Sequence, residues 1–126
     1  MRRAKSNEHG EQSAYFDWWR AYAKSRHIHE SLCFAIKNDS AHTDAGRIYR
    51  WKEGVQAGVW DVFLAIPRGG YHGMFLEFKY GKNKLDPKQL EFYSRVSYYN
   101  YRMQAVWSAD EAIKEVQQYL RLPFKY

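Results

Sequence analysis

The sequence predicts one mixed α/β domain over residues 1–126, with helices flanking a central sheet. Two apolar runs between residues 59 and 80 have the length and composition of neighbouring strands. Segments in which apolar residues recur at helical spacing stand before and after these runs. A chain of 126 residues, 45% of them hydrophobic and 18% aromatic, can bury one core but not two.

The first helix is expected over residues 7–25. Aromatic residues recur there at the spacing of one buried helix face, namely Tyr15, Trp18, Trp19 and Tyr22. Ser6 or Asn7 can cap the start of this helix. Glu8 and Glu11 lie in its first turn, where the helix dipole favours anions.

The middle of the chain contains three expected strands and one helix. Residues 31–38 are a short strand, and residues 40–54 form a polar, arginine-rich helix that ends at Gly54. Residues 59–66 are apolar at every position but one, which suits a strand covered on both faces. After a turn with two glycines, residues 74–80 form the next strand.

The carboxyl-terminal part is expected to add two helices and a strand. The segment Asp86–Gln89 opens a helix with a cap, a proline in the first position and a glutamine three residues after the cap. Residues 102–108 form the last core strand. Ser108–Glu111 is a capping box that opens the final helix, whose apolar stripe consists of Ile113, Val116 and Leu120.

Charged residues interrupt two of the expected strands. Asp61 lies in one, and Glu77 and Lys79 lie in the other. Strand side chains alternate between faces, so Glu77 and Lys79 point the same way as Phe75, opposite to Met74, Leu76, Phe78 and Tyr80. Burying an unpaired carboxylate costs on the order of several kcal/mol, and two that meet across neighbouring strands would repel each other. A divalent cation between them removes this repulsion, and Mg²⁺ prefers such oxygen ligands.

A simpler interpretation remains open, in which Glu77 and Lys79 form an exposed ion pair and Asp61 ends a loop. Exposed pairs are common and contribute roughly 0–1 kcal/mol. The complete set favours a metal site instead: an aspartate, a two-glycine turn, a glutamate and a lysine two residues later, all on expected central strands.

This set resembles the PD-(D/E)xK nuclease signature. The whole chain resembles the VRR-NUC domain, a small nuclease module of phage and bacterial proteins and of the Fanconi-associated nuclease. The resemblance starts at "NEHGEQ" with Glu8 and Gln12 and passes through "FAIKN", which ends at Asn38. It continues over "EGVQAGVWD", "RGGYHGMFLEFKYGKNKLDPKQ" and "WSADEAIKEVQQYL". It implies a restriction-endonuclease-like fold, and it departs at Trp60, where the family usually has proline.

The resemblance implies a site for Mg²⁺ or Mn²⁺. Asp61 and Glu77 are the expected ligands, and the backbone carbonyl of Phe78 completes the contribution of the strands. Glu8 is a third expected ligand, because the E-x-x-x-Q spacing of the family is met by Glu8 and Gln12. Glu11 competes with Glu8 for this role.

Two further residues are implied in catalysis. Lys79 would orient or activate the attacking water and stabilise the negative charge that develops on the phosphate. Gln89 matches an active-site position of the family, although its place three residues after a helix cap also has a purely structural explanation.

The charge balance favours a polyanionic partner. The chain has 20 Lys and Arg against 14 Asp and Glu, a net charge of +6. Basic residues before and after the expected catalytic strands either contact DNA phosphates or form a solvated face, namely Arg47, Arg50, Lys52, Lys82 and Lys84. One cysteine, Cys33, cannot form an internal disulfide, and no apolar run approaches the ~18 residues of a membrane span. We therefore expect no membrane association and a cytoplasmic location, in the host if the protein is phage-encoded.

The expected function is that of a metal-dependent DNA endonuclease. Stand-alone members of the family look like homodimers that act on branched DNA such as four-way (Holliday) junctions, and the tyrosine-rich segment 91–107 could line such an interface. Two alternatives stay open. One is a non-catalytic module of the same fold that binds DNA, and the other is a nuclease that acts on flaps or on RNA.

Overall fold

A four-stranded mixed sheet forms the centre of the protein in a computed structural model, which describes residues 8–37 and 43–124. The strand order follows the chain: β1 (Cys33–Ala35), β2 (Val62–Leu64), β3 (Met74–Phe78) and β4 (Arg102–Val106). Strands β1, β2 and β3 pair in antiparallel fashion, whereas β3 and β4 are parallel. The parallel pair requires a crossover, which a helix provides.

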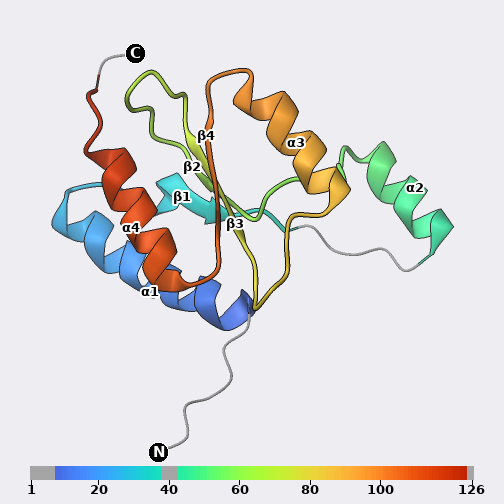
Figure 1. Cartoon of the computed structure of the whole chain (residues 1–126), viewed down its shortest axis with the longest axis horizontal. Coiled ribbons are helices and arrows are strands. Elements are labelled where there is room, and N and C mark those ends of the chain that lie inside the picture. Colours follow the sequence, from blue (N-terminus) through green and yellow to red (C-terminus); the bar gives the residue numbers. More distant parts are fainter. Residues whose placement is uncertain (1–7, 38–42, 125–126) are drawn as a thin grey trace, which may run out of the picture.

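The helices of the described part lie around this sheet (Figure 1). They are α1 (Glu8–Ser25), α2 (Asp44–Lys52), α3 (Pro87–Ser97) and α4 (Ala109–Leu120), with a short 3₁₀ helix, η1 (Glu30–Leu32), before β1. Helices α1 and α4 lie side by side on one side of the sheet, α3 lies on the other, and α2 lies apart from the sheet (Figure 1). The predicted α/β class with flanking helices is confirmed. None of the described helices is both long and apolar enough to cross a bilayer.

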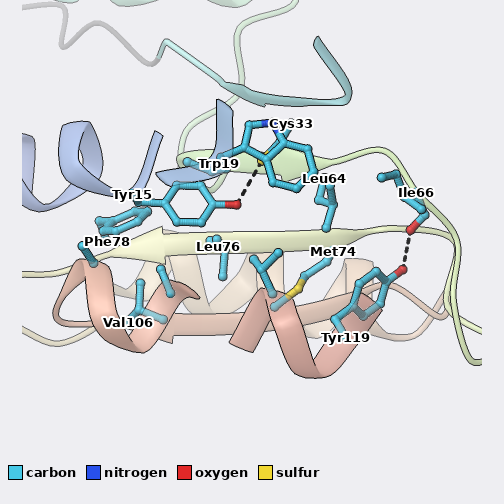
Figure 2. Packing of buried hydrophobic residues seen from close by; sticks show 14 of the residues in the cluster. Tyr15, Trp19, Cys33, Leu64, Ile66, Met74, Leu76, Phe78, Val106 and Tyr119 are labelled. Carbon is cyan, nitrogen blue, oxygen red and sulfur yellow. Dashed lines mark hydrogen bonds between the residues drawn. The ribbon is translucent and has the colours of Figure 1, made fainter. Parts of the chain in front are cut away.

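The main core lies between the sheet and the helices α1 and α4 (Figure 2). The alternation predicted for β3 is confirmed, because its buried apolar residues Met74, Leu76 and Phe78 face this core. Polar atoms inside the core are paired. The hydroxyl of Tyr15 lies 3.3 Å from Sγ of Cys33, and the hydroxyl of Tyr119 donates to the carbonyl of Ile66 over 2.7 Å (Figure 2).

The opposite face of the sheet is only partly covered. The ring of Phe75 meets the ring of Phe92 from α3 edge-to-face at 5.3 Å, which anchors α3 there. Phe63 also packs on Phe75, but Phe34 at the outer strand stays 44% exposed. The strand around β2, expected to be covered on both faces, is sealed on the α1–α4 face and only partly covered on the other.

Several predicted helix ends are confirmed, and some predictions lie outside the described residues. Thr43 caps α2, and Gly54 follows that helix with φ +94°, a conformation that favours glycine. Ser108 caps α4 as predicted, but the carboxylate of Glu111 accepts a hydrogen bond from Trp107 rather than from Ser108, so the predicted capping box is only half formed. The expected cap at residues 6–7 and the residue Asn38 lie outside the described ranges.

Candidate active site

Asp61 and Glu77 meet at the junction of β2 and β3. The antiparallel register pairs Val62 with Leu76, so the residue before Val62 lies opposite the residue after Leu76. The backbone N–H of Asp61 donates to Oε1 of Glu77 over 3.0 Å. In return, the backbone N–H of Phe78 donates to Oδ2 of Asp61 over 3.0 Å. Each carboxylate is therefore held by the backbone of the other strand, and the two acidic side chains converge as the sequence predicts.

This exchange also explains why β2 is shorter than predicted. The N–H of Asp61 is used by the Glu77 side chain and not by a ladder bond to a neighbouring strand. The carbonyl of Asp61 still accepts from the N–H of Ile36 over 2.6 Å, so the chain after β1 stays attached to the site. The local backbone gives up regular pairing here in order to orient a buried carboxylate.

Glu77 is buried next to a second carboxylate. Its side chain is 5% exposed and that of Lys79 is 11% exposed, so the interpretation as an exposed ion pair is wrong. Burial, followed by the neighbouring carboxylate of Asp61, raises the pKa of Glu77 to about 8, although the charge of Lys79 acts in the opposite direction. Burial and the negative charge of Asp61 therefore both disfavour the ionised form of Glu77.

Lys79 lies one step further along the same strand and points to the same side as Glu77. Its Nζ is 3.8 Å from Oε2 of Glu77. Its backbone N–H donates to the carbonyl of Val106 over 2.8 Å, so the parallel pairing with β4 extends past the end of β3 and fixes the base of this side chain. The ammonium group is thus held beside the acidic pair with limited access to solvent.

The side chain of Gln89 contacts both the helix cap and the acidic pair. Its Oε1 accepts from the backbone N–H of Asp86 over 3.0 Å, while Oδ1 of Asp86 accepts from the N–H of Gln89 over 2.9 Å, which completes the predicted capping box of α3. Its Nε2 donates to Oε2 of Glu77 over 2.8 Å. The start of α3 is thereby tied to the acidic pair.

The oxygen donors of this site fit a hard divalent cation. A carboxylate oxygen accepts in two directions, so an oxygen that already accepts one N–H keeps a second direction for a ligand. Carboxylate and carbonyl oxygens are what Mg²⁺ and Mn²⁺ prefer, and a cation next to both acids would offset the repulsion between them.

The third expected carboxylate is that of Glu8, at the start of α1. No three His, Cys, Asp or Glu side chains gather at one point within the part of the chain that is described. Glu8 begins α1, but its side chain lies outside that part. Glu11 has a structural role, because its Oε2 accepts from the backbone N–H of Ala109 over 2.8 Å and joins α1 to the first turn of α4. Glu8 stays a predicted ligand.

The predicted DNA-contacting residues fall into two groups. Lys82 and Lys84 are exposed on the turn that directly follows Lys79, and the indole of Trp107 holds this turn by donating to the carbonyl of Asn83 over 2.9 Å. The other group, Arg47, Arg50 and Lys52, lies on α2, away from the sheet (Figure 1). The first group therefore lies on the turn after the strand that carries Glu77, whereas the second lies on a helix apart from the sheet.

From the sequence, Trp60 is expected only to shape the entry to the strand that carries Asp61. This residue is 1% exposed, and its Nε1 donates to the backbone carbonyl of Gln89 over 3.1 Å. An indole directly before a buried aspartate was visible in the sequence, but its partner lies 29 positions later in another element.

Comparison with solved structures supports this fold. A protein titled "VRR_NUC domain protein" superposes on the chain with a TM-score of 0.75 and 24% sequence identity, over 96% of this chain and 93% of the other. The likeness confirms the predicted fold. No family model matches the sequence, and neither does any curated protein.

Proposed function

We propose that the chain is a divalent-metal-dependent endonuclease that hydrolyses phosphodiester bonds in DNA. The observation that carries this proposal is the convergence of Asp61 and Glu77, with Lys79 and Gln89 both in contact with Glu77. A buried Glu77 between a second carboxylate and a partly buried lysine costs stability, and the core does not need it. The fold shared with a VRR-NUC domain protein is consistent with this function.

Asp61 and Glu77 would hold the cation, together with the carbonyl of Phe78 and the carboxylate of Glu8. A bound Mg²⁺ or Mn²⁺ supplies Lewis acidity at the scissile phosphate and lowers the pKa of the attacking water. The hydrogen bonds from the backbones of Asp61 and Phe78 fix the orientation of both strand carboxylates before any ligand arrives. Such preorganisation avoids a reorganisation cost during the reaction.

Lys79 and Gln89 both contact Oε2 of Glu77 and would have different roles there. The ammonium group of Lys79 orients the attacking water and stabilises the negative charge that builds up on the phosphate oxygens. The amide of Gln89 holds Oε2 of Glu77 at 2.8 Å and so restricts the rotation of that carboxylate. We therefore expect both residues to affect kcat more than the affinity for DNA.

The proposed substrate is branched DNA, cut by a homodimer. The net charge of +6 supports a polyanionic partner, and Lys82 and Lys84 beside the acidic pair are suited to phosphate contacts. Tyr98 and Tyr99, in the segment expected to line a dimer interface, are 79% and 66% exposed, so they are available to a second copy. A dimer with two-fold symmetry would place two acidic pairs on a symmetric junction.

The test is incubation of the protein with supercoiled plasmid, a synthetic four-way junction and a 5′ flap, each with Mg²⁺, Mn²⁺ or EDTA. Symmetric nicks at the junction centre, lost with EDTA and with Asp61→Asn, are the expected result. The matched control is Asp17→Asn, because Asp17 is 83% exposed in a surface ion pair with Arg20 and should leave cleavage unchanged.

Other outcomes would change the assignment in defined ways. Cleavage of the flap alone would remove the junction assignment and keep the nuclease. No cleavage of any DNA with either metal would favour the non-catalytic module. Cleavage of an RNA hairpin alone would move the substrate class to RNA. Sedimentation of wild type against a Tyr98→Ser, Tyr99→Ser variant tests the dimer, which the double substitution should weaken.

A further inference from the structure

Trp60 joins the entry to β2 to helix α3 at one buried position. Its ring stacks on the ring of Tyr93 from α3, with centroids 5.9 Å apart and planes inclined by 19°. Its indole N–H donates to the carbonyl of Gln89 over 3.1 Å, in the first turn of the same helix. The next residue in the chain is Asp61. A side chain that is 1% exposed and has two anchors on α3 has little freedom to move.

These contacts close a ring around the acidic pair. The backbone N–H of Asp61 donates to one oxygen of Glu77, and the amide of Gln89 donates to the other. The carbonyl of Gln89 accepts from Trp60, which is covalently joined to Asp61. The ring therefore runs through four residues, and three hydrogen bonds and one peptide link hold it together.

The approach to Trp60 is also fixed. Gly58 has φ +85°, and a Cβ at this position would lie 2.3 Å from the carbonyl oxygen of Lys88. The chain before Trp60 thus runs directly against the first turn of α3, at a distance that only glycine permits. The chain that enters β2 therefore contacts α3 at Lys88, before the indole contact with Gln89, and at Tyr93, after it.

We propose that Trp60 is a positioning residue that sets the placement of Gln89 relative to Glu77, and with it the geometry of the metal-binding carboxylates. This inference rests on the proposed nuclease function. The indole N–H of Trp60 is directed to the carbonyl of Gln89 and not to a carboxylate. It holds the backbone of Gln89 at the start of α3. The side-chain amide of Gln89 is thereby kept within hydrogen-bonding distance of Glu77.

The decisive variant is Trp60→Phe, which keeps an aromatic ring against Tyr93 and removes only the indole donor. The matched control is Trp19→Phe. Trp19 is also 1% exposed, and its indole donates to the carbonyl of Glu30 over 2.9 Å, away from the acidic pair. Both substitutions delete one indole–carbonyl hydrogen bond from a buried site, so both should lower the melting temperature.

Metal affinity and kinetics separate the two variants. We expect Trp60→Phe to raise the dissociation constant for Mn²⁺, measured by calorimetry without DNA, and to lower kcat, each by about 10-fold, as is typical when a residue that orients a ligand is lost. KM for DNA should stay unchanged. Trp19→Phe should leave the Mn²⁺ affinity, kcat and KM as in wild type. Equal values for the two variants would overturn the inference.

A double-mutant cycle with Gln89→Ala adds an independent criterion. If Trp60 acts through Gln89, the double variant should be no worse in kcat than Gln89→Ala alone, because the second substitution removes a contact that no longer serves the site. Effects that multiply would show that Trp60 acts by another route and would contradict the inference.

Mn²⁺ binding and cleavage by the wild-type protein show whether the nuclease function or only the role of Trp60 has to be given up. A wild-type protein that binds no Mn²⁺ and cuts no nucleic acid removes the proposed function itself. A wild-type protein that does both, with Trp60→Phe unchanged, removes only the role of Trp60. If Trp60→Phe does not fold, Tyr93→Leu replaces it, since this half-exposed ring stacks on the indole. It should raise the Mn²⁺ dissociation constant in the same direction, and no change would overturn the inference.

Discussion

The side-chain amide of Gln89 joins a helix cap to a buried carboxylate. Its Nε2 lies 2.8 Å from Oε2 of Glu77, while its Oε1 accepts from the backbone N–H of Asp86 over 3.0 Å. An amide with both ends engaged cannot rotate without breaking one of two hydrogen bonds. The orientation of Glu77 is therefore coupled to the folding of the first turn of α3.

This coupling predicts different effects for two substitutions in the same turn. Asp86→Ala removes the side-chain cap and should lower the free energy of unfolding by about 1 kcal/mol with little change in kcat. Gln89→Ala should cost a similar amount of stability and should also lower kcat by about 10-fold, as the loss of a group that orients a ligand does. Urea unfolding and single-turnover cleavage measure the two quantities. Equal kcat values for the two variants would restrict Gln89 to the capping role.

Lys79 should affect the chemical step and not the binding of DNA. Lys79→Ala is expected to reduce kcat by roughly 10²–10³-fold, the usual effect of losing a group that stabilises transition-state charge. Mn²⁺ binding should be largely retained, because Lys79 contacts the site through its positive charge alone. Lys82→Ala, three residues later on the exposed turn, should instead raise KM and weaken its dependence on salt. A rise in KM with unchanged kcat for Lys79→Ala would contradict its assigned role.

Glu77 should make the stability of the metal-free protein dependent on pH. Its pKa is raised from 4.5 to about 8, mainly by burial, so the folded state binds the proton more tightly than the unfolded state does. The contribution of Glu77 to the free energy of unfolding should therefore be highest below about pH 4.5. It should fall as the pH rises towards 8. Thermal unfolding in EDTA from pH 5 to 9 tests this. Glu77→Gln should give a flatter curve, and parallel curves would argue against the shift.

Cys33 should be chemically inert in the folded protein. Burial raises the pKa of its thiol to about 12, although the hydrogen bond with Tyr15 acts in the opposite direction. The reactive thiolate is therefore almost absent at pH 8. A thiol reagent such as 5,5′-dithiobis(2-nitrobenzoate) should react only as fast as the protein unfolds, and immediately in guanidinium chloride. Fast reaction of the folded protein at pH 8 would show that Cys33 is not sealed in the core.

The sequence was sufficient for the features that depend on local patterns. The aromatic spacing of α1, the capping residues of α3 and the alternation along β3 all follow from rules about neighbouring residues, and the structure confirms each. The neighbourhood of Asp61 and Glu77 could also be expected, because strands that follow each other in the chain usually lie next to each other in a sheet.

The features that sequence could not supply depend on contacts between distant residues. The indole of Trp60 finds the carbonyl of Gln89, and Glu11 finds the N–H of Ala109, which lies 98 positions later. No spacing rule links such pairs, because their distance depends on how the elements pack. The same reason explains β2, where the side chain of Glu77 takes a backbone donor that regular strand pairing would have used.

The most direct test of the account is an anomalous difference map from crystals soaked in Mn²⁺. The account predicts a peak in contact with carboxylate oxygens of both Asp61 and Glu77, and no such peak in crystals of the Asp61→Asn variant. An empty site in the wild-type protein at saturating Mn²⁺, with both carboxylates still facing each other, would contradict the central claim that this pair binds a metal ion.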